Sequence, residues 1–462
     1  MSQDYHLLYT LSQKRFRRKL KSKHKKKAKR FRINLKHLVL RKILGKPYTY
    51  LDVLQAFLPK NIKYLLFDCY DSSIHLNKLS SAVLNSGRFY VPVEFSLIDT
   101  PEESYQFIND LVSALVLQKA ERIIIDYSKC KRVTMDAQIF LDVIIKDVIT
   151  FYKRCKEYKQ LRPSVLNIKG DNVIDIDVRK MLYSVGSPAI HSNATIRFKD
   201  IVPYKLCIHN SLSNNPKTIE RKDIDTTRLA DYVLDSLSRL NRKLTPEKLE
   251  DLCIVISEIL INAEEHSSNK YRYSIGYFTE KNVEGKHFGV FRLVIMNFGQ
   301  TIYEKFKDPD CPNKNVVQKM KELSNSYNKR KLFIFKEFEE ETLWTLYSLQ
   351  EGVTSTDPQE YKKRGNGSIR FIESFFNIKG EKRIVDDFSK MTIISGNTQI
   401  VFDGSYNIVR NKRNNENFQY ITFNESGNIM NKPDAKFVKF ADNYFPGTII
   451  SAEMLFNEDD LE

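Results

Sequence analysis

The chain has no uninterrupted apolar run that approaches the ~20 residues of a membrane-spanning helix, so an integral membrane protein is not expected. Its basic N-terminus lacks both the apolar core and the small-residue cleavage site of a secretory signal, so secretion is not expected either. These two absences favour a cytoplasmic protein. The hydrophobic fraction of 42% excludes a mainly disordered chain, and 462 residues suffice for about two or three domains.

Cysteine is scarce, and no two cysteines form a Cys-x-x-Cys pair. The eight histidines likewise show no pair with metal-ligand spacing. A zinc site and a disulfide framework are therefore not expected, and the thiols are predicted to be reduced and mostly buried. The six cysteines are Cys69, Cys130, Cys155, Cys207, Cys253 and Cys311.

The net charge of +17 is concentrated in one segment. Residues 14–42 hold 16 lysines and arginines, and the only acidic residue before position 43 is Asp4, so this arm carries +15 and the remainder +2. Like charges repel unless a polyanion compensates them, so we expect the arm to bind the phosphate backbone of DNA or RNA, with an anionic membrane surface as the second candidate. The expected contact residues are Arg15, Arg17, Arg18, Lys19, Lys25, Lys26, Lys27, Lys29, Arg30 and Arg32.

The remaining chain divides by its pattern of expected elements. Residues 88–205 alternate strands with helices, which is typical of an α/β layer. The expected strands include 89–97 and the apolar run 122–126, and the expected helices include 101–118 and 137–154. Two helices, at 226–244 and 245–266, then precede a series of strands that includes 391–395 and 398–402, which is typical of an α+β sandwich. The predicted zones are a basic arm (1–46), a connecting segment of unclear fold (47–87), the α/β domain (88–205), a linker (206–219), the sandwich domain (220–457) and an acidic tail (458–462).

The helix expected at residues 245–266 carries two distinct faces. Leu249, Leu252, Ile256, Ile259 and Ala263 form an apolar stripe. The polar residues of the other face are Glu258, Asn262, Glu265 and His266. Taken alone, such a polar face is typical of a solvated helix surface, and only the elements that follow it in the chain favour a site.

This helix is followed by three glycine-containing elements. Asn297-Phe-Gly299 ends an apolar strand, Arg364-Gly365-Asn-Gly367 comes next, and Gly447-Thr448 opens a late strand. With Glu258-x-x-x-Asn262-Ala-x-x-His266 before them, these elements resemble, in order, the N box and the glycine boxes of the GHKL ATPase and kinase family, which includes gyrase, heat-shock chaperones, histidine kinases and MutL. The spacing around Asn262 is most similar to the anti-sigma-factor serine kinases.

The resemblance implies a GHKL α/β sandwich with helices on a mixed sheet, and a site for ATP and Mg²⁺. The side-chain oxygen of Asn262 suits a hard Mg²⁺ ion, and the carboxylate of Glu258 suits orientation or deprotonation of the attacking group. Gly365 and Gly367 let the backbone approach phosphates, and Arg364 adds positive charge. The resemblance also assigns His266, Asn297, Gly299 and Thr448 to the nucleotide site, His266 either at a phosphate or at the helix end.

Three positions depart from the family pattern. Asn297 stands where the family usually has an Asp that accepts a bond from the adenine amino group; an amide can accept the same bond and adds a donor. Thr301 stands where a second glycine is common, and Ser368 where Leu is usual. The segment between the first two glycine-containing elements, residues 302–363, is long and charged, and is expected to form a lid that also serves as a docking surface.

The α/β zone has a resemblance of its own. Ile123-Ile-Ile-Asp126-Tyr-Ser128, followed by Val133-Thr134-Met-Asp136-Ala137, is similar to a STAS domain, the anti-sigma antagonist fold, and a generic α/β layer is the alternative. In those domains a Ser or Thr after the Asp at the start of the helix accepts phosphate, whereas this sequence has Ala137 at that position, with Thr134 nearby.

Two functional hypotheses follow, with a third that lacks catalysis. The first is an ATP-driven switch in which Mg-ATP binding and lid closure regulate a partner, with nucleic acid on the arm. The second is an anti-sigma-type protein serine/threonine kinase. The third is a nucleotide-binding regulatory scaffold without turnover. The composition, rich in Lys, Asn and Ile, hints at a bacterial regulatory protein.

Overall fold

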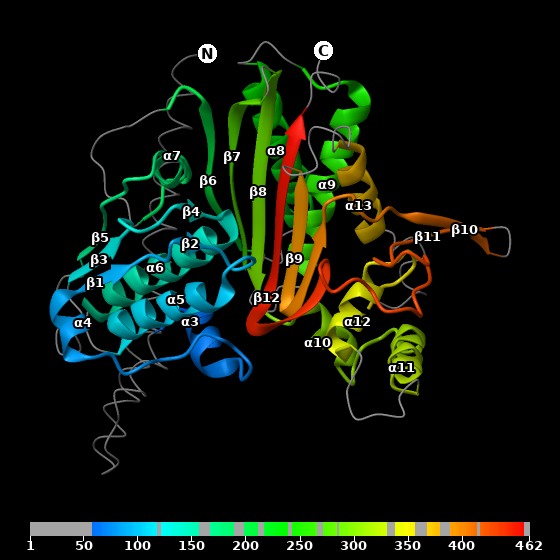
Figure 1. Cartoon of the computed structure of the whole chain (residues 1–462), viewed down its shortest axis with the longest axis horizontal. Helices are drawn as coiled ribbons and strands as arrows, with labels where there is room; N and C mark the ends of the chain where they lie inside the picture. Colours follow the sequence, from blue (N-terminus) through cyan, green and yellow to red (C-terminus); the bar gives the residue numbers. More distant parts are fainter. Residues whose placement is uncertain are drawn as a thin grey trace, which may run out of the picture. The chain divides into compact units, whose positions relative to one another are not determined.

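The computed structural model describes residues 58–456 apart from 118–121, 157–166, 189–197, 211–216, 239–242, 266–270, 284–285, 330–337, 356–366, 379–388 and 414–415. The chain divides into two compact units, Met1–Pro59 and Lys60–Glu462. The predicted arm at 1–46 and the acidic tail at 458–462 lie outside the described residues. The second unit is a mixed α/β structure, which confirms the general fold class predicted from the sequence (Figure 1).

The first part of this unit is a parallel α/β layer. Strands β1 (Arg88–Tyr90), β3 (Arg122–Asp126) and β5 (Asn167–Asp171) pair in the order β1-β3-β5. The helices that accompany them are α3 (Lys60–Lys63), the π-helical turn η1 (Tyr64–Asp68), α4 (Ser81–Ser86), α5 (Pro101–Val116), α6 (Met135–Lys156) and α7 (Ile176–Val185). The helices predicted at 101–118 and 137–154 are confirmed as α5 and α6.

Local sequence explains several of these boundaries. The single strand expected at 89–97 is instead two strands in different sheets, β1 and β2 (Glu94–Phe95), the latter paired with β4 (Arg132–Val133). Pro92 lies between them and has no N–H to donate, so the ladder breaks there. Helix α7 begins where the Asp175 side chain accepts from two backbone N–H groups, and ends at Gly186 in the left-handed conformation.

The second part is a five-stranded sheet in which every neighbouring pair is antiparallel. Its strands are β6 (Ile201–Asn210), β7 (Tyr271–Val283), β8 (Lys286–Phe298), β9 (Lys390–Phe402) and β12 (Val438–Phe456), in the order β6-β7-β8-β12-β9. Strand β6 thus joins this sheet from residues that the sequence assigned to the α/β domain and the linker. The two strands predicted within 391–402 form one strand, β9, with Gly396 at a left-handed φ of 61° beside a bulge in β12.

Helices cover one face of this sheet. They are α8 (Lys217–Ser238), α9 (Pro246–Glu265) and α13 (Gly367–Ile378), with α10 (Ile302–Lys307), α11 (Lys314–Lys329) and α12 (Glu340–Ser348) packing further along the same core. Alternate residues of the strands, such as Leu293 and Ile295, pack against apolar residues of α9, such as Ile256. A small hairpin, β10 (Val409–Arg413) and β11 (Glu416–Tyr420), completes the described elements.

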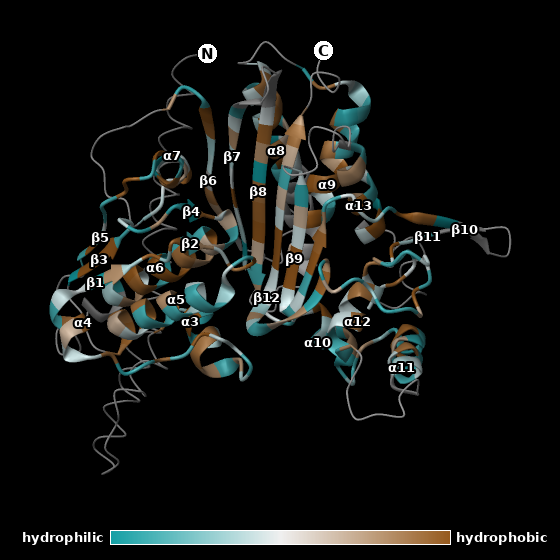
Figure 2. Cartoon of the chain, viewed as in Figure 1, coloured by the Kyte–Doolittle hydropathy of each residue, from teal (hydrophilic) through white to brown (hydrophobic). Residues whose placement is uncertain are grey.

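The opposite face of the sheet is covered by the α/β layer. Phe140 of α6 lies 5.9 Å from Phe298 and 5.4 Å from Phe445, measured between ring centroids. Apolar residues along β8 and α6 are visible in Figure 2. The five-stranded sheet is therefore buried on both faces, by α9 and its neighbours on one side and by α6 on the other.

Candidate functional site

Four polar residues form one row across the sheet, on the face that α9 covers. Register pairs Arg272 of β7 with Asn297 of β8, Asn297 with Thr448 of β12, and Thr448 with Ser395 of β9. All four side chains are buried, although the strands around them are otherwise apolar. Because buried polar groups are costly unless they are paired or bind something, this polar row is the strongest candidate site among the described residues.

Asn297 is the member of the polar row whose side chain makes no hydrogen bond to a described residue. It is 0% exposed, and neither its Oδ1 nor its Nδ2 atom has a hydrogen-bond partner among the described residues. An unpaired buried amide costs about 1–3 kcal/mol for each unmade bond. A group that supplied one acceptor and one donor to this side chain would recover that free energy.

The other members of the polar row are held in place by neighbours. Arg272 Nη2 lies 2.7 Å from Asp225 Oδ2 of α8, and Arg272 Nη1 lies 3.4 Å from the carbonyl oxygen of Leu260 on α9. This buried ion pair ties the first residues of β7 to both helices. It also neutralises the guanidinium, so the row presents amide and hydroxyl groups and little net charge.

The hydroxyl groups at the far end of the row bond to one another. Ser395 Oγ and Thr448 Oγ1 are 3.1 Å apart, and either hydroxyl can be the donor. Ser395 Oγ also lies 3.2 Å from the Gly447 carbonyl and accepts from the Ile302 N–H at 2.9 Å. The position of Thr448 is therefore fixed, whereas the direction of its hydroxyl hydrogen is not.

Two glycines let the backbone close around Asn297. Gly299 and Gly447 have φ values of 145° and 148°, and the Gly299 N–H donates to the Pro446 carbonyl at 3.3 Å. A Cβ atom on Gly447 would lie 2.1 Å from the Asn297 carbonyl oxygen. Only glycine fits there, because the strands approach too closely for a side chain.

Two of the sequence elements predicted to form the site, Asn297-Phe-Gly299 and Gly447-Thr448, lie side by side at this end of the sheet. Helix α9 carries Glu258, which is half-buried, and Asn262, one turn later, in the half of the helix whose Leu260 carbonyl bonds to Arg272. Asn262 is placed by its backbone only. His266, Arg364 and Gly365 lie outside the described residues.

Helix α13 brings a further predicted element to the same place. Near the start of α9, Lys248 Nζ donates to the Asn377 carbonyl, and Asn377 Nδ2 donates to Asp251 Oδ1 at 3.4 Å. Because Asn377 is close to the end of α13 and the two helices stay in contact, they run antiparallel. Over about ten residues at 1.5 Å each, α13 reaches back to its first residue, Gly367, beside the α9 turn that contains Asn262.

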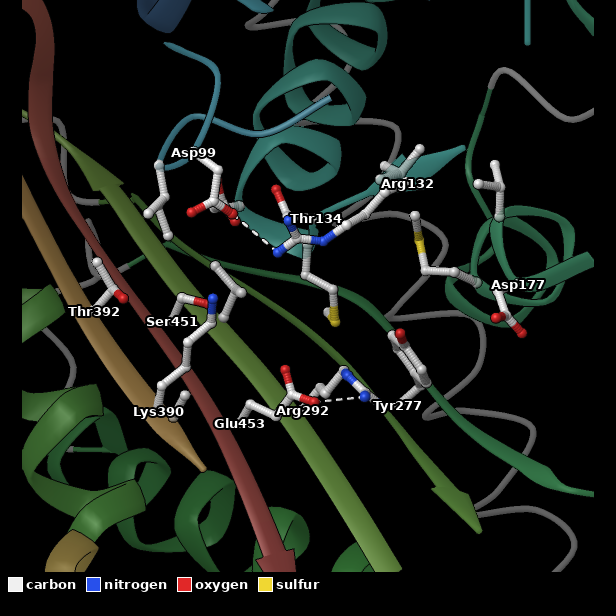
Figure 3. Close-up of a pocket in the computed structure, with 18 of the residues that line it drawn as sticks. Asp99, Arg132, Thr134, Asp177, Tyr277, Arg292, Lys390, Thr392, Ser451 and Glu453 are labelled. Atoms are coloured by element: carbon white, nitrogen blue, oxygen red, sulfur yellow. Dashed lines mark hydrogen bonds and ion pairs between the residues drawn. The ribbon is translucent and has the colours of Figure 1, made fainter. Parts of the chain in front are cut away.

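A second polar feature, which the sequence did not reveal, lies on the opposite face of the sheet (Figure 3). A cavity of about 370 Å³ separates the sheet from the starts of α6 and α7. Its floor includes another register row, in which Arg292 Nη2 lies 2.5 Å from Glu453 Oε1 and the guanidinium lies 5.1 Å from the centroid of the Tyr277 ring. Burial raises the pKa of Tyr277, so the phenol stays protonated.

The charges around this cavity balance. In its upper wall, Arg132 Nη2 lies 2.9 Å from Asp99 Oδ2. The charged residues of the lining are Lys131, Arg132, Arg292 and Lys390 against Asp99, Asp136, Asp177 and Glu453. A cavity with balanced charge does not select an anion or a cation by sign, so it is a weaker candidate than the polar row.

No family model, curated protein or solved structure matches the chain. Among the described residues, no helix is long and apolar enough to cross a membrane, and no group of three or more His, Cys, Asp or Glu side chains is placed to hold a metal ion. Function is therefore inferred from the chain's own residues.

Proposed function

We propose that the chain is a nucleotide-binding switch protein that binds Mg-ATP between α9, the start of α13 and the polar row. The observation that carries this proposal is the buried amide of Asn297, which has no hydrogen-bond partner among the described residues. It lies beside Thr448 at the end of the sheet where α9 carries Glu258 and Asn262. The edge of a nucleotide base is flat and offers a hydrogen-bond donor and an acceptor side by side, so it can bond to both the oxygen and the nitrogen of this amide.

The proposed roles follow from the placement of each element. The base lies against Asn297 and Thr448, where Gly299 and Gly447 keep the backbone close. Asn262 supplies an oxygen ligand to Mg²⁺, and Glu258, one turn earlier, orients or deprotonates the attacking water or hydroxyl. Phosphates are received at the glycines that precede and open α13, with Arg364 and His266 as further candidates.

Regulation of a partner is the second half of the proposal. Nucleotide binding would change a surface that a partner contacts, and the basic arm would hold nucleic acid. Of the residues expected to form a lid, those of α10, α11 and α12 instead pack apolar side chains into the core beside the sheet. For the arm, we expect affinity for DNA and RNA fragments that falls steeply as salt is raised from 50 to 200 mM, about 1,000-fold or more. Salt-independent binding, or binding to anionic vesicles alone, would overturn the assignment to nucleic acid.

The nucleotide proposal is tested by calorimetric titration with Mg-ATP and by phosphate release. We expect Asn262→Ala to abolish Mg-dependent binding, and Glu258→Gln to retain binding while slowing hydrolysis about 100-fold or more. Glu250→Gln, an exposed position on the same helix, is the matched control and should change neither. Absence of Mg-dependent ATP binding by the wild type would refute the proposal, whereas unchanged turnover in both variants would refute only the residue roles.

A protein serine/threonine kinase is the alternative, favoured by the Glu258-x-x-x-Asn262-Ala-x-x-His266 spacing. Incubation with γ-labelled ATP separates the two: labelled protein supports the kinase, and free phosphate alone supports the ATPase. Tight binding with neither product supports a non-catalytic regulatory scaffold.

A further inference from the structure

The amide of Asn297 is unusual because nothing in the described structure fixes its orientation. A buried Asn is normally oriented by a protein partner on Oδ1 or Nδ2, and here neither atom has one. The amide can therefore turn by 180° and exchange the positions of its donor and acceptor without losing a bond to any described residue.

The neighbouring hydroxyl groups share this freedom. Thr448 Oγ1 can donate to Ser395 Oγ, or accept from it and donate elsewhere, because Ser395 also has the Gly447 carbonyl as an acceptor within 3.2 Å. Two nitrogens of the Arg272 guanidinium, Nη1 and Nη2, are held by the Leu260 carbonyl and by Asp225 and not by Asn297. Hence the polar row can present either arrangement of donor and acceptor to a ligand.

The two common purine classes differ in this arrangement. A 6-aminopurine presents a donor at its amino group and an acceptor at N1, whereas a 6-oxopurine presents an acceptor at O6 and a donor at N1. An amide with a fixed orientation distinguishes them, but an amide that can turn satisfies both.

We propose that the polar row binds 6-amino and 6-oxo purine nucleotides with comparable affinity. The inference rests on the proposed function, because it concerns the base that the same site would hold. It assigns Asn297 as the residue that recognises the edge of a purine without choosing between its two forms.

The test compares three triphosphates that differ only at this edge: ATP, inosine triphosphate and the triphosphate of unsubstituted purine riboside, which lacks a 6-substituent. By titration of the full chain with Mg²⁺, we expect ATP and inosine triphosphate to bind within about threefold of each other. Both should bind about tenfold more tightly than the unsubstituted purine, which loses one of the two bonds.

Asn297→Leu supplies the second arm of the test, because leucine has a similar size and no polar atoms. This variant should bind all three nucleotides equally weakly. It should also melt at or above the wild-type temperature without nucleotide, since an unpaired buried amide has been removed. Thr392→Val, a buried polar-to-apolar change on the opposite face of the sheet, is the control and should leave the order of affinities unchanged.

The outcomes separate the two proposals. A preference of tenfold or more between ATP and inosine triphosphate in the wild type would overturn the inference while leaving a nucleotide site in place. The inference would also be overturned if Asn297→Leu bound ATP and inosine triphosphate as tightly as the wild type does, because the base would then be held elsewhere. Failure of all three nucleotides to bind would refute the proposed function itself.

Discussion

At the scale of single residues, Gly447 is the position where backbone geometry limits the sequence most. A Cβ atom there would lie 2.1 Å from the Asn297 carbonyl oxygen, at a φ of 148° that L-residues rarely adopt. We expect Gly447→Ala to lower the free energy of unfolding by about 3 kcal/mol or more, and to weaken nucleotide binding by moving Asn297. Thermal and chemical unfolding measure the first effect, and titration with Mg-ATP the second.

The matched control for this substitution is Gly352→Ala. Gly352 also has a positive φ, 75°, but nothing lies within 4 Å of its missing Cβ atom. Gly352→Ala should therefore lower the free energy of unfolding by about 1 kcal/mol, because only the unfavourable backbone conformation contributes. Equal costs at the two glycines would contradict the close approach of the strands.

Asp142 is expected to make stability depend on pH. It is buried in α6, and burial raises its pKa to about 7, although the Ser187 hydroxyl and the Gln138 amide each donate to Oδ1 at 2.7 Å and lower it in part. In the unfolded chain its pKa is about 3.9. The stabilisation that protonated Asp142 gives the folded protein is fully present below about pH 4 and is lost as the pH rises through about 7. Between these two pH values only the unfolded chain releases the proton.

Asp142→Asn should remove this dependence. Between pH 5 and 7, the stability of the variant relative to wild type should increase by about 1.4 kcal/mol per pH unit. Chemical denaturation of both proteins at pH 5, 6, 7 and 8 measures the difference. Parallel stability curves would show that Asp142 is already ionised in the folded protein.

At the scale of elements, the ion pair between Arg272 of β7 and Asp225 of α8 fixes a helix to the sheet. Both side chains are almost fully buried, with 2.7 Å between Nη2 and Oδ2. We expect Asp225→Asn to cost about 3–5 kcal/mol, because it leaves a buried guanidinium without its counter-charge. Arg410→Ala, which removes a largely exposed partner of Glu373, should cost about 1 kcal/mol or less. A similar cost for the two variants in denaturant titrations would contradict the burial of the first pair.

Elements with a clear hydrophobic period could be predicted from the sequence. The stripe of α9 and the apolar run of β3 correctly indicated a helix and a buried strand. The strand after Phe89 was predicted as one element because its apolar residues continue through Pro92, where the ladder breaks. Strand β6 could not be assigned to its sheet, since pairing with β7 depends on residues about 70 positions away.

Only part of the candidate site could be predicted from the sequence. Asn297 and Thr448 were recognised by their neighbouring glycines, but their direct pairing across β8 and β12 required the strand register. Arg272 was missed, although a single arginine in the apolar run after Tyr271 is a signal of a buried ion pair. The predicted contacts of the arm with nucleic acid, and the roles of His266, Arg364 and Gly365, stay predictions, because these residues lie outside the described part of the chain.

At the scale of the whole unit, α6 packs directly behind the strand end that carries Asn297. Phe140 contacts Phe298, the next residue along β8, and the Tyr64 hydroxyl donates to the Gly299 carbonyl at 3.0 Å. We expect Phe140→Ala to cost about 3–5 kcal/mol and also to change nucleotide affinity, since it loosens the support of β8. Titration with Mg-ATP and thermal unfolding measure the two effects.

Phe151→Ala is the control for this substitution. Phe151 is equally buried on the same helix, and its ring lies against Tyr152. It should cost a similar free energy of unfolding and leave nucleotide affinity unchanged. A loss of nucleotide affinity in both variants would indicate general destabilisation. It would contradict the expectation that Phe140 supports the site specifically, through its contact with Phe298.

The strand order has a consequence for how the chain acquires its structure during synthesis. Strand β12 lies between β8 and β9, yet it is the last of the five to leave the ribosome. Until then, β8 has one bare edge and β9 has no described partner in this sheet, so both can pair with the wrong strand or another chain. The final register also brings Thr448 to Asn297. The nascent protein therefore cannot form the polar row before its last strand is made, and a partly synthesised chain would have no complete site.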